Sequence, residues 1–259
     1  MILIKEENMK ADFHSHILPG FDDGAANTDT ALKMINMSMD MGVDHIVSTS
    51  HCYPYSDRDI AEFLDERAAA FSRLREAAEQ SGTRLPEIRL GSEVHLTCDL
   101  TRLKLIKSLC VEGTKYMLLE MPSSNWTDNV IDIVYKLTIS GVKPIIAHME
   151  RNLGQKKELV EALCDLDVLI QINAWSFGAP QFKKYIDRMF GQSLIHIIGT
   201  DMHNLDTRRP DMNKAEKYIR RRYGDECWSY LMNNAETVLS GRELSYRMLK
   251  SFKKKGIFG

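Results

Sequence analysis

Short apolar segments recur along this chain, and residues that can bind a metal ion follow each of them. The first segment is centred on Phe13, between Asp12 and the pair His14 and His16. Six more follow, at residues 46–47, 88–90, 118–119, 145–146, 168–172 and 195–198. They read as continuous apolar runs more than as alternating ones, which is typical of parallel strands covered by helices. Since the carboxyl ends of parallel strands open on one face, this pattern predicts one site shared by several strands.

Segments with helical spacing lie between the apolar runs. In residues 28–41, for example, Leu32, Ile35 and Met39 lie on one stripe. We expect helices at 28–41, 57–80, 99–108, 128–140, 159–166, 181–190 and 212–223, followed by terminal helices. The repeated alternation of strand and helix predicts an α/β protein with a closed or nearly closed barrel. An open doubly wound sheet is the alternative, and it would spread the same functional residues along one edge.

Length and composition set further bounds. The chain has 259 residues, 44% of them hydrophobic, and no linker rich in Pro, Gly or Ser divides it. We expect a single domain over residues 9–240, a short N-terminal extension at 1–8 and a C-terminal basic tail at 241–259. The formal net charge of -2 gives no reason to expect nucleic acid, and no stretch reaches the roughly 20 apolar residues needed for membrane insertion. The five cysteines form no CxxC pair, which favours a reducing, cytoplasmic location.

Histidines and acids at the predicted strand ends could form a polynuclear metal site. His14 and His16 lie on the same side of an extended segment because side chains alternate with a period of two. The full set has five imidazoles and four carboxylates: His14, His16, Asp23, His51, Glu93, Glu120, His148, Asp201 and His203. Carboxylates crowded at one mouth repel each other, and divalent cations would offset that repulsion. One ion cannot take so many ligands, so about two or three ions are expected. Imidazoles mixed with carboxylates suit Mn, Fe or Zn.

Several motifs resemble those of a known superfamily. They are "DFHSHILPGFDDGA", "VSTSHCYP", "GSEVHL", "LLEMP", "IAHMERN" and "TDMHNLDTRRP". Together they resemble the polymerase and histidinol phosphatase (PHP) superfamily, most closely its bacterial manganese-dependent protein-tyrosine phosphatases of capsule and exopolysaccharide biosynthesis. The resemblance implies that the set of histidines and acids above holds three metal ions, and that Arg151 and Arg208 bind phosphate. It also implies a distorted (β/α)7 TIM-like barrel with its active site at the C-terminal ends of the strands.

The activity implied by this resemblance is hydrolysis of phosphotyrosine by a metal-activated hydroxide. Manganese (Mn2+) is the expected cofactor, with Fe, Zn or Mg as alternatives. The implied substrate is the tyrosine-rich tail of a bacterial tyrosine kinase that controls polysaccharide export, and homo-oligomer formation is left open. Two other functions stay as alternatives: a small-molecule phosphatase such as a histidinol-phosphatase, and a catalytically silent exonuclease-like or regulatory binding module.

A different nucleophile also has to be weighed. Cys52 and Arg58 have the Cys-x5-Arg spacing of cysteine-dependent tyrosine phosphatases. The loop between them contains no glycine, Pro54 has no amide to donate, and Asp57 would repel a phosphate. These features weigh against a thiol mechanism.

Two other groups of residues have both functional and structural interpretations. Tyr53, Tyr55 and Trp126 lie in predicted loops near strand ends, where they could frame an aromatic substrate or pack the turns. A run of lysines and arginines between residues 214 and 222 is most simply the solvated face of a helix.

Overall fold

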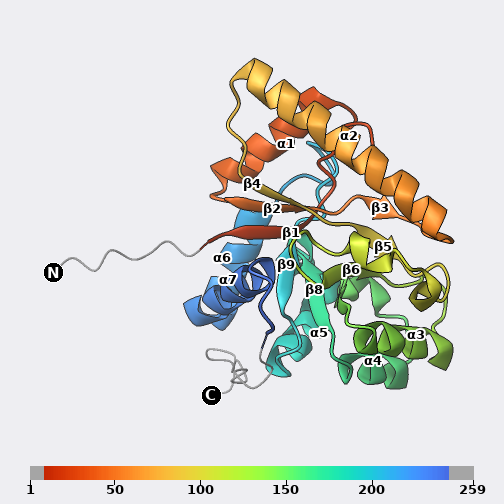
Figure 1. The fold of residues 1–259 in the computed structure, drawn as a ribbon. Helices are drawn as coiled ribbons and strands as arrows, with labels where there is room; N and C mark the ends of the chain where they lie inside the picture. The colour runs from red at the N-terminus through yellow and green to blue at the C-terminus, as the bar shows by residue number, and fades with distance from the viewer. Residues whose placement is uncertain (1–8, 245–259) are drawn as a thin grey trace.

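The computed structural model describes residues 9–244, and its centre is a curled sheet of parallel strands (Figure 1). Every strand pair in this part of the chain is parallel. The strands are β1 (Ala11–Ser15), β2 (His45–Ser48), β3 (His51–Cys52), β4 (Glu87–Leu90), β5 (Glu93–His95), β6 (Tyr116–Glu120), β7 (Lys143–Ile146), β8 (Leu169–Asn173) and β9 (Ile197–Gly199).

Two bent strands connect the two parts of the sheet. One part has the order β1-β2-β4, and the other has the order β3-β5-β6-β7-β8-β9. Only Thr49 and Ser50 separate β2 from β3, and only Gly91 and Ser92 separate β4 from β5. Each pair is therefore one interrupted strand, and together the strands match the apolar runs of the sequence.

The two edges of the sheet meet at β1. The N–H of His16 donates to the carbonyl of Met202 at 3.0 Å, and the N–H of Asp201 donates to that of His14 at 2.7 Å. Since Met202 follows β9, these bonds join the last strand to the first. The α/β class and the distorted, TIM-like barrel are confirmed, and the open doubly wound alternative is wrong.

Seven helices pack around the sheet in the described residues, with α1 and α2 on the opposite side from α3 and α4 (Figure 1). They are α1 (Thr28–Asp40), α2 (Asp57–Ser81), α3 (Asp128–Ile139), α4 (Lys157–Cys164), α5 (Pro180–Gly191), α6 (Met212–Tyr223) and α7 (Asp225–Leu239). The boundaries lie within about two residues of those expected, which is the usual uncertainty of helix ends. Local signals explain some of them: Ser56 and Asp59 form a capping box at the start of α2, and Gly82 ends that helix in a left-handed conformation.

The helix expected at residues 99–108 is wrong. Two 3₁₀-helices, Leu100–Arg102 and Ile106–Leu109, stand in its place. The buried side chains here are Leu100, Leu103, Ile106 and Leu109, spaced by three residues. A 3₁₀-helix repeats every three residues, so this spacing places them on one face of two short turns better than on an α-helix.

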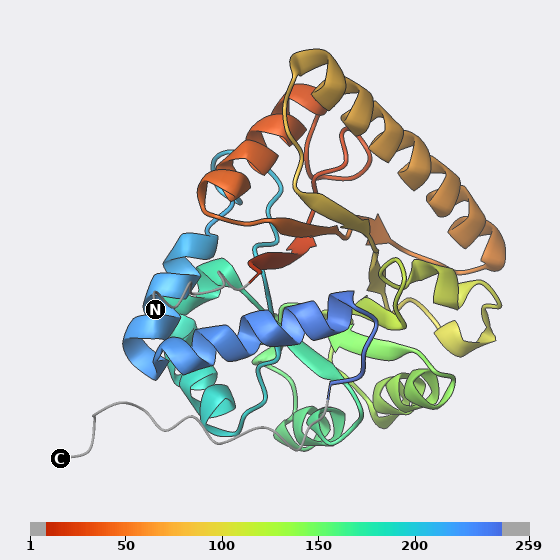
Figure 2. The ribbon, with the colours of Figure 1, turned by 60° about the vertical axis from the view of Figure 1, so that its left-hand side comes forward.

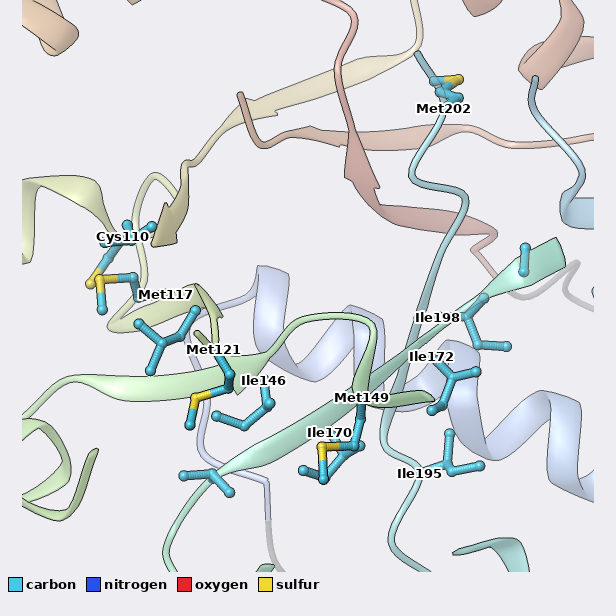
Figure 3. Close-up of a cluster of buried hydrophobic side chains, with 14 of the residues drawn as sticks. Cys110, Met117, Met121, Ile146, Met149, Ile170, Ile172, Ile195, Ile198 and Met202 are labelled. Atoms are coloured by element: carbon cyan, nitrogen blue, oxygen red, sulfur yellow. The ribbon is translucent and has the colours of Figure 1, made fainter. Parts of the chain in front are cut away.

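Both faces of the sheet are buried. Ile146, Ile170, Ile172 and Ile198 belong to a large apolar cluster (Figure 3). Their neighbours along the strands, such as Ile145 and Leu169, belong to a second cluster with Val238 of α7, and Figure 2 shows α7 running across the sheet. Adjacent strand residues point to opposite faces, so continuous apolar runs are what a sheet covered on both sides requires.

Two further expectations concern membrane-spanning helices and the division of the chain into one domain with two terminal segments. No helix between residues 9 and 244 is long and apolar enough to cross a membrane. The extension at 1–8 and most of the tail at 241–259 lie outside the described residues. The division into one domain with two terminal segments stays a prediction.

Candidate metal centre

The barrel brings all of the expected histidines and acids to one place. Asp23 lies in the loop between β1 and α1, and the others lie in or close to the ends of β1, β3, β5, β6, β7 and β9. Three groups have ligand atoms within 4.8 Å of one another: His16, Asp23, His51 and His203; His14, His16 and Asp201; and His51, Glu93 and Glu120. The groups share His16 and His51, so they form one continuous cluster.

Glu93 lies at the centre of this cluster. Its Oε2 atom is 3.1 Å from His14 Nε2, 3.3 Å from His16 Nε2 and 3.1 Å from His51 Nδ1. Its Oε1 atom is 2.8 Å from His148 Nε2, which in turn is 3.7 Å from Glu120 Oε1. A single carboxylate therefore connects histidines that come from four different positions along the chain.

Asp23 marks the solvent side of the cluster. Its Oδ1 atom is 3.2 Å from His203 Nε2 and 3.3 Å from His51 Nε2. Its side chain is 61% exposed, whereas those of Glu93 and His203 are almost completely buried. A substrate group can therefore approach the cluster from the side of Asp23.

Burial and close charges oppose each other at the cluster. Burial would lower the pKa of His16, but hydrogen bonds with Asp22 and Glu93 outweigh it and raise the pKa to about 10. The pKa of Glu93 is far below its ordinary value: burial favours the acid, but His14 and His148 stabilise the carboxylate more strongly. Burial and the neighbouring His16 lower the pKa of His203 to about 4. Metal ligation requires unprotonated imidazoles, so cations and protons compete for this cluster.

The free lone pairs of the cluster fit divalent cations. His51 Nδ1, His148 Nδ1 and His203 Nε2 are buried and lack a hydrogen bond, although His51 Nδ1 lies 3.1 Å from Glu93 Oε2 and His203 Nε2 lies 3.2 Å from Asp23 Oδ1. A buried polar atom without a partner costs about 1–3 kcal/mol. A shared cation removes that cost for several of them at once. Imidazole and carboxylate without thiolate is a donor set that suits manganese, iron or zinc.

The backbone is strained at two of these residues. His148 has φ 30° and ψ 56°, and Asp201 has φ 58°, both in the left-handed region that non-glycine residues rarely adopt. Such strain persists only where the surrounding structure enforces it, and it concentrates at functional sites. Both side chains point into the cluster, since His148 Nε2 is 2.8 Å from Glu93 Oε1 and Asp201 Oδ1 is 3.4 Å from His14 Nε2.

Two glycines allow the backbone to approach the paired histidines. A Cβ atom on Gly199 would lie 2.3 Å from the Cβ of His14, and one on Gly24 would lie 2.2 Å from the carbonyl oxygen of His16. Neither distance is sterically allowed, so both positions require glycine.

The two expected phosphate-binding arginines meet at Asp201. Arg208 Nη2 is 2.7 Å from Asp201 Oδ1, and Arg151 Nη2 forms an ion pair with Asp201 Oδ2. Arg208 Nη1 is also 3.6 Å from Asp23 Oδ2. Both guanidinium groups are partly exposed, so they form a cationic edge beside the cluster.

The sequence interpretation assigned no supporting role to several residues that hold the cluster. Asp22 accepts from His16 Nδ1 at 2.8 Å and from the N–H of His51 at 3.1 Å. His95 pairs with Glu120 at 2.9 Å. Gln171 and Asn173 are fully buried and bonded to the cluster. Polar residues at alternate positions of an apolar strand were a usable signal for the last two.

The geometry excludes the thiol mechanism. Cys52 is buried, and burial raises the pKa of its thiol to about 12. Arg58 lies in α2, where its exposed side chain pairs with Glu62 at 2.7 Å. A nucleophilic cysteine needs a low pKa and a cation aimed at the phosphate. Arg67 is the cation near Cys52, but it is buried and donates to the carbonyl of Gly91, and the pKa of the thiol stays high.

Among the remaining aromatic and basic residues, some have a structural role and one lies beside the cluster. Trp126 is buried and donates to the carbonyl of Pro122 at 3.0 Å, so it packs a turn. Tyr53 is half exposed and lies beside the cluster, with its ring centroid 5.7 Å from that of His51. In the basic helix α6, Arg220 pairs with Glu216 and Asp225, and Arg222 pairs with Asp187.

Comparison with known families and proteins gives a consistent result. The family model described as "Capsular polysaccharide synthesis, CpsB/CapC" matches residues 10–240. The tyrosine-protein phosphatase YwqE of Bacillus subtilis is 29% identical over 265 residues, which cover 96% of this chain and 98% of the relative. The tyrosine-protein phosphatase CpsB of Streptococcus agalactiae is 31% identical over 241 residues, which cover 88% of this chain and 97% of the relative.

The fold also has a solved counterpart. A chain from the crystal structures of YwqE from Bacillus subtilis and CpsB from Streptococcus pneumoniae, described as unique metal-dependent tyrosine phosphatases, superimposes with a TM-score of 0.74. The match covers 91% of this chain and 96% of that chain at 25% sequence identity.

Proposed function

This chain belongs to the CpsB/CapC family of capsular polysaccharide synthesis, and we propose that it is a metal-dependent phosphatase that hydrolyses phosphotyrosine in a protein. The observation that carries the proposal is the convergence of buried imidazoles and carboxylates on Glu93. A cluster of this kind is expensive to bury without cations and has no structural purpose that an apolar core would not serve better.

We propose that the metal ligands are the full set expected from the sequence: His14, His16, Asp23, His51, Glu93, Glu120, His148, Asp201 and His203. The three groups with mutually close atoms correspond to about two or three ions, and Mn2+ is the proposed ion. Bound divalent cations would lower the pKa of a water molecule to make a nucleophile and would neutralise the charge of the phosphate.

The protein residues bind and orient the substrate. Arg151 and Arg208 present planar guanidinium groups at the edge of the cluster, where each can donate two hydrogen bonds to phosphate oxygens. Exposure at Asp23 and Tyr53 leaves the mouth open to a side chain carried on a protein. The phenol of tyrosine has a pKa of about 10, so its oxygen leaves more easily than that of an alcohol and depends less on a general acid.

The proposed function also includes a protein substrate and a cellular location. The substrate we propose is the phosphorylated, tyrosine-rich tail of a tyrosine kinase in capsule or exopolysaccharide biosynthesis. We place the protein in the cytoplasm, where its five thiols would stay reduced. Self-association stays a prediction from the resemblance.

The proposal is tested by metal analysis and by rates on two substrates. Protein purified without chelators should contain more than one ion per chain, or gain activity on addition of Mn2+. It should hydrolyse a phosphotyrosine peptide much faster than histidinol phosphate. Preference for histidinol phosphate would replace the proposed substrate by a small molecule, and absence of both metal and Mn2+ activation would refute the metal mechanism.

A matched pair of variants tests the site itself. Glu93→Gln keeps the size of the side chain but removes the charge that connects the histidines. Removing a residue that only orients a metal ligand typically lowers activity by roughly 10- to 100-fold. Glu93→Gln alters a proposed ligand itself, so turnover should fall by more than roughly 100-fold. Glu87→Gln alters an exposed glutamate of β4 that pairs with Arg89, and it should leave turnover unchanged. Equal rates for the two variants would contradict the site as assigned.

A further inference from the structure

A pair of buried side-chain amides links three of the proposed ligands. Gln171 and Asn173 are fully buried and lie two residues apart in β8, so their side chains share one face. Gln171 Nε2 donates to Asn173 Oδ1 at 2.8 Å, and Asn173 Nδ2 donates to Asp201 Oδ2 at 2.8 Å. At the other end, Gln171 Oε1 accepts from the N–H of His148 at 2.6 Å and lies 3.3 Å from His14 Nδ1.

The groups at the two ends fix the direction of this amide pair. A backbone N–H can only donate, so Gln171 must turn its oxygen toward His148. A carboxylate can only accept, so Asn173 must turn its amino group toward Asp201. The inner bond then has one arrangement, in which Gln171 donates and Asn173 accepts. Neither amide can flip without breaking two hydrogen bonds.

This direction also sets the state of His14. Because Gln171 Oε1 faces His14 Nδ1, the proton of a neutral imidazole is held on Nδ1. The lone pair then lies on Nε2, which is the atom that is 3.1 Å from Glu93 Oε2 and 3.1 Å from His16 Nε2. The ring of His14 is thus oriented with Nε2 toward the other proposed ligands.

The amide pair also lies between the two strained ligands. The bond from His148 N–H to Gln171 holds one left-handed residue, and the bond from Asn173 to Asp201 holds the side chain of the other. Burying two amides costs free energy unless their hydrogen bonds are formed. An apolar pair would fill the same strand face at lower cost, so stability alone does not explain why amides stand here.

We propose that Gln171 and Asn173 are positioning residues that preorganise His14, His148 and Asp201 for cation binding. The inference rests on the proposed function only in that the cluster binds metal. Partners of this kind, which hold the far side of a ligand, typically change metal affinity by roughly 10- to 100-fold.

Calorimetric titration with Mn2+ of protein stripped of metal tests the inference. Gln171→Met and Asn173→Ala should each weaken Mn2+ binding by roughly 10- to 100-fold. The double variant should lose less affinity than the sum of the two losses, because both changes break the same connection. Asn234→Ala is the control: Asn234 is a buried amide that donates to the carbonyl of His196 at 2.9 Å, in α7. It should lower the free energy of unfolding without changing Mn2+ affinity.

Unchanged Mn2+ affinity in either folded variant would overturn the inference, as would an equal loss in Asn234→Ala. If Gln171→Met does not fold, Asn173→Ser, a smaller change at the end of the strand, decides in the same titration. Wild-type protein that binds Mn2+ but does not hydrolyse phosphotyrosine would refute the proposed function and leave this inference standing. Wild-type protein that binds no Mn2+ would overturn both.

Discussion

Tyr53 is the residue best placed to recognise an aromatic substrate. Its ring is 52% exposed and lies 5.5 Å from that of His95 and 5.7 Å from that of His51. Burial and the negative charges of Glu120 and Glu93 raise the pKa of its phenol. The exposed face of the ring can therefore stack on the ring of a phosphotyrosine bound at the metal centre.

We predict that Tyr53→Ala raises KM for a phosphotyrosine peptide. An aromatic pair contributes about 0.5–1.5 kcal/mol, which corresponds to roughly 2- to 12-fold in KM. Steady-state kinetics with Tyr55→Ala as the control provide the measurement, because Tyr55 is 69% exposed and lies two residues further along the same loop. A phosphoserine peptide should show no such change. Equal effects of the two variants on the phosphotyrosine peptide would contradict the stacking role.

Cys52 provides a second test at the level of single residues. Its thiol is buried and its pKa is raised to about 12, so it cannot act as a nucleophile at neutral pH. Cys52→Ser should therefore keep the turnover number of the wild type, whereas a chelator should abolish it. Turnover that survives the chelator and disappears in the variant would reverse this conclusion.

At the scale of elements, the contact between β1 and β9 determines the spacing of the histidines. A Cβ on Gly199 would lie 2.3 Å from the Cβ of His14 and 2.7 Å from its backbone nitrogen. The clash with backbone cannot be relieved by a side-chain rotation, so the two strands would have to separate.

Gly199→Ala should therefore destabilise the fold by about 1–3 kcal/mol and weaken Mn2+ binding together. Urea denaturation measures the first effect and calorimetric titration the second. Gly178→Ala is the matched control, because a Cβ there would meet nothing within 4 Å. A stable Gly199→Ala protein with normal Mn2+ affinity would show that the strands tolerate a wider spacing.

At the scale of the whole molecule, a buried histidine makes the fold sensitive to acid. His196 precedes β9, and its Nδ1 atom accepts from the N–H of Ile170 at 3.0 Å. Burial lowers the pKa of His196 from 6.5 to about 4. Between pH 6.5 and about pH 4, His196 is therefore protonated in the unfolded chain but neutral in the folded protein. The stabilisation from the neutral imidazole is complete above pH 6.5 and is lost as the pH falls through this range.

The loss should reach about 2 kcal/mol at pH 5. Urea denaturation of the wild type and of His196→Gln at pH 7 and pH 5 measures it. The difference in unfolding free energy between the two proteins should shrink by that amount on acidification. His45→Gln, a change at a surface histidine, should leave the pH dependence of the wild type intact. An equal pH dependence in wild type and His196→Gln would exclude this histidine as the cause.

Much of the architecture could be read from the chain alone. Apolar runs and helical stripes are local patterns, because burial of a strand or helix face imposes its period on neighbouring residues. Most of the ligand set was also local, since its members lie in a strand or close to a strand end, although Asp23 lies in the loop between β1 and α1. Residues 100–109 were misinterpreted because a period of three resembles a helical stripe over so short a length.

The tertiary structure decided what depends on distance across the barrel. From the sequence, the four carboxylates were equivalent candidates for metal ligands. Only the strand register places Glu93 at the centre of the cluster and Asp23 at its exposed edge. Likewise, the bond from Asn173 to Asp201, which completes the connection that begins at Gln171, joins residues 28 positions apart. Hydrophobic pattern specifies which face of each element is buried, but the distances between side chains on different strands follow from register, twist and the bonds that join β1 to the segment after β9.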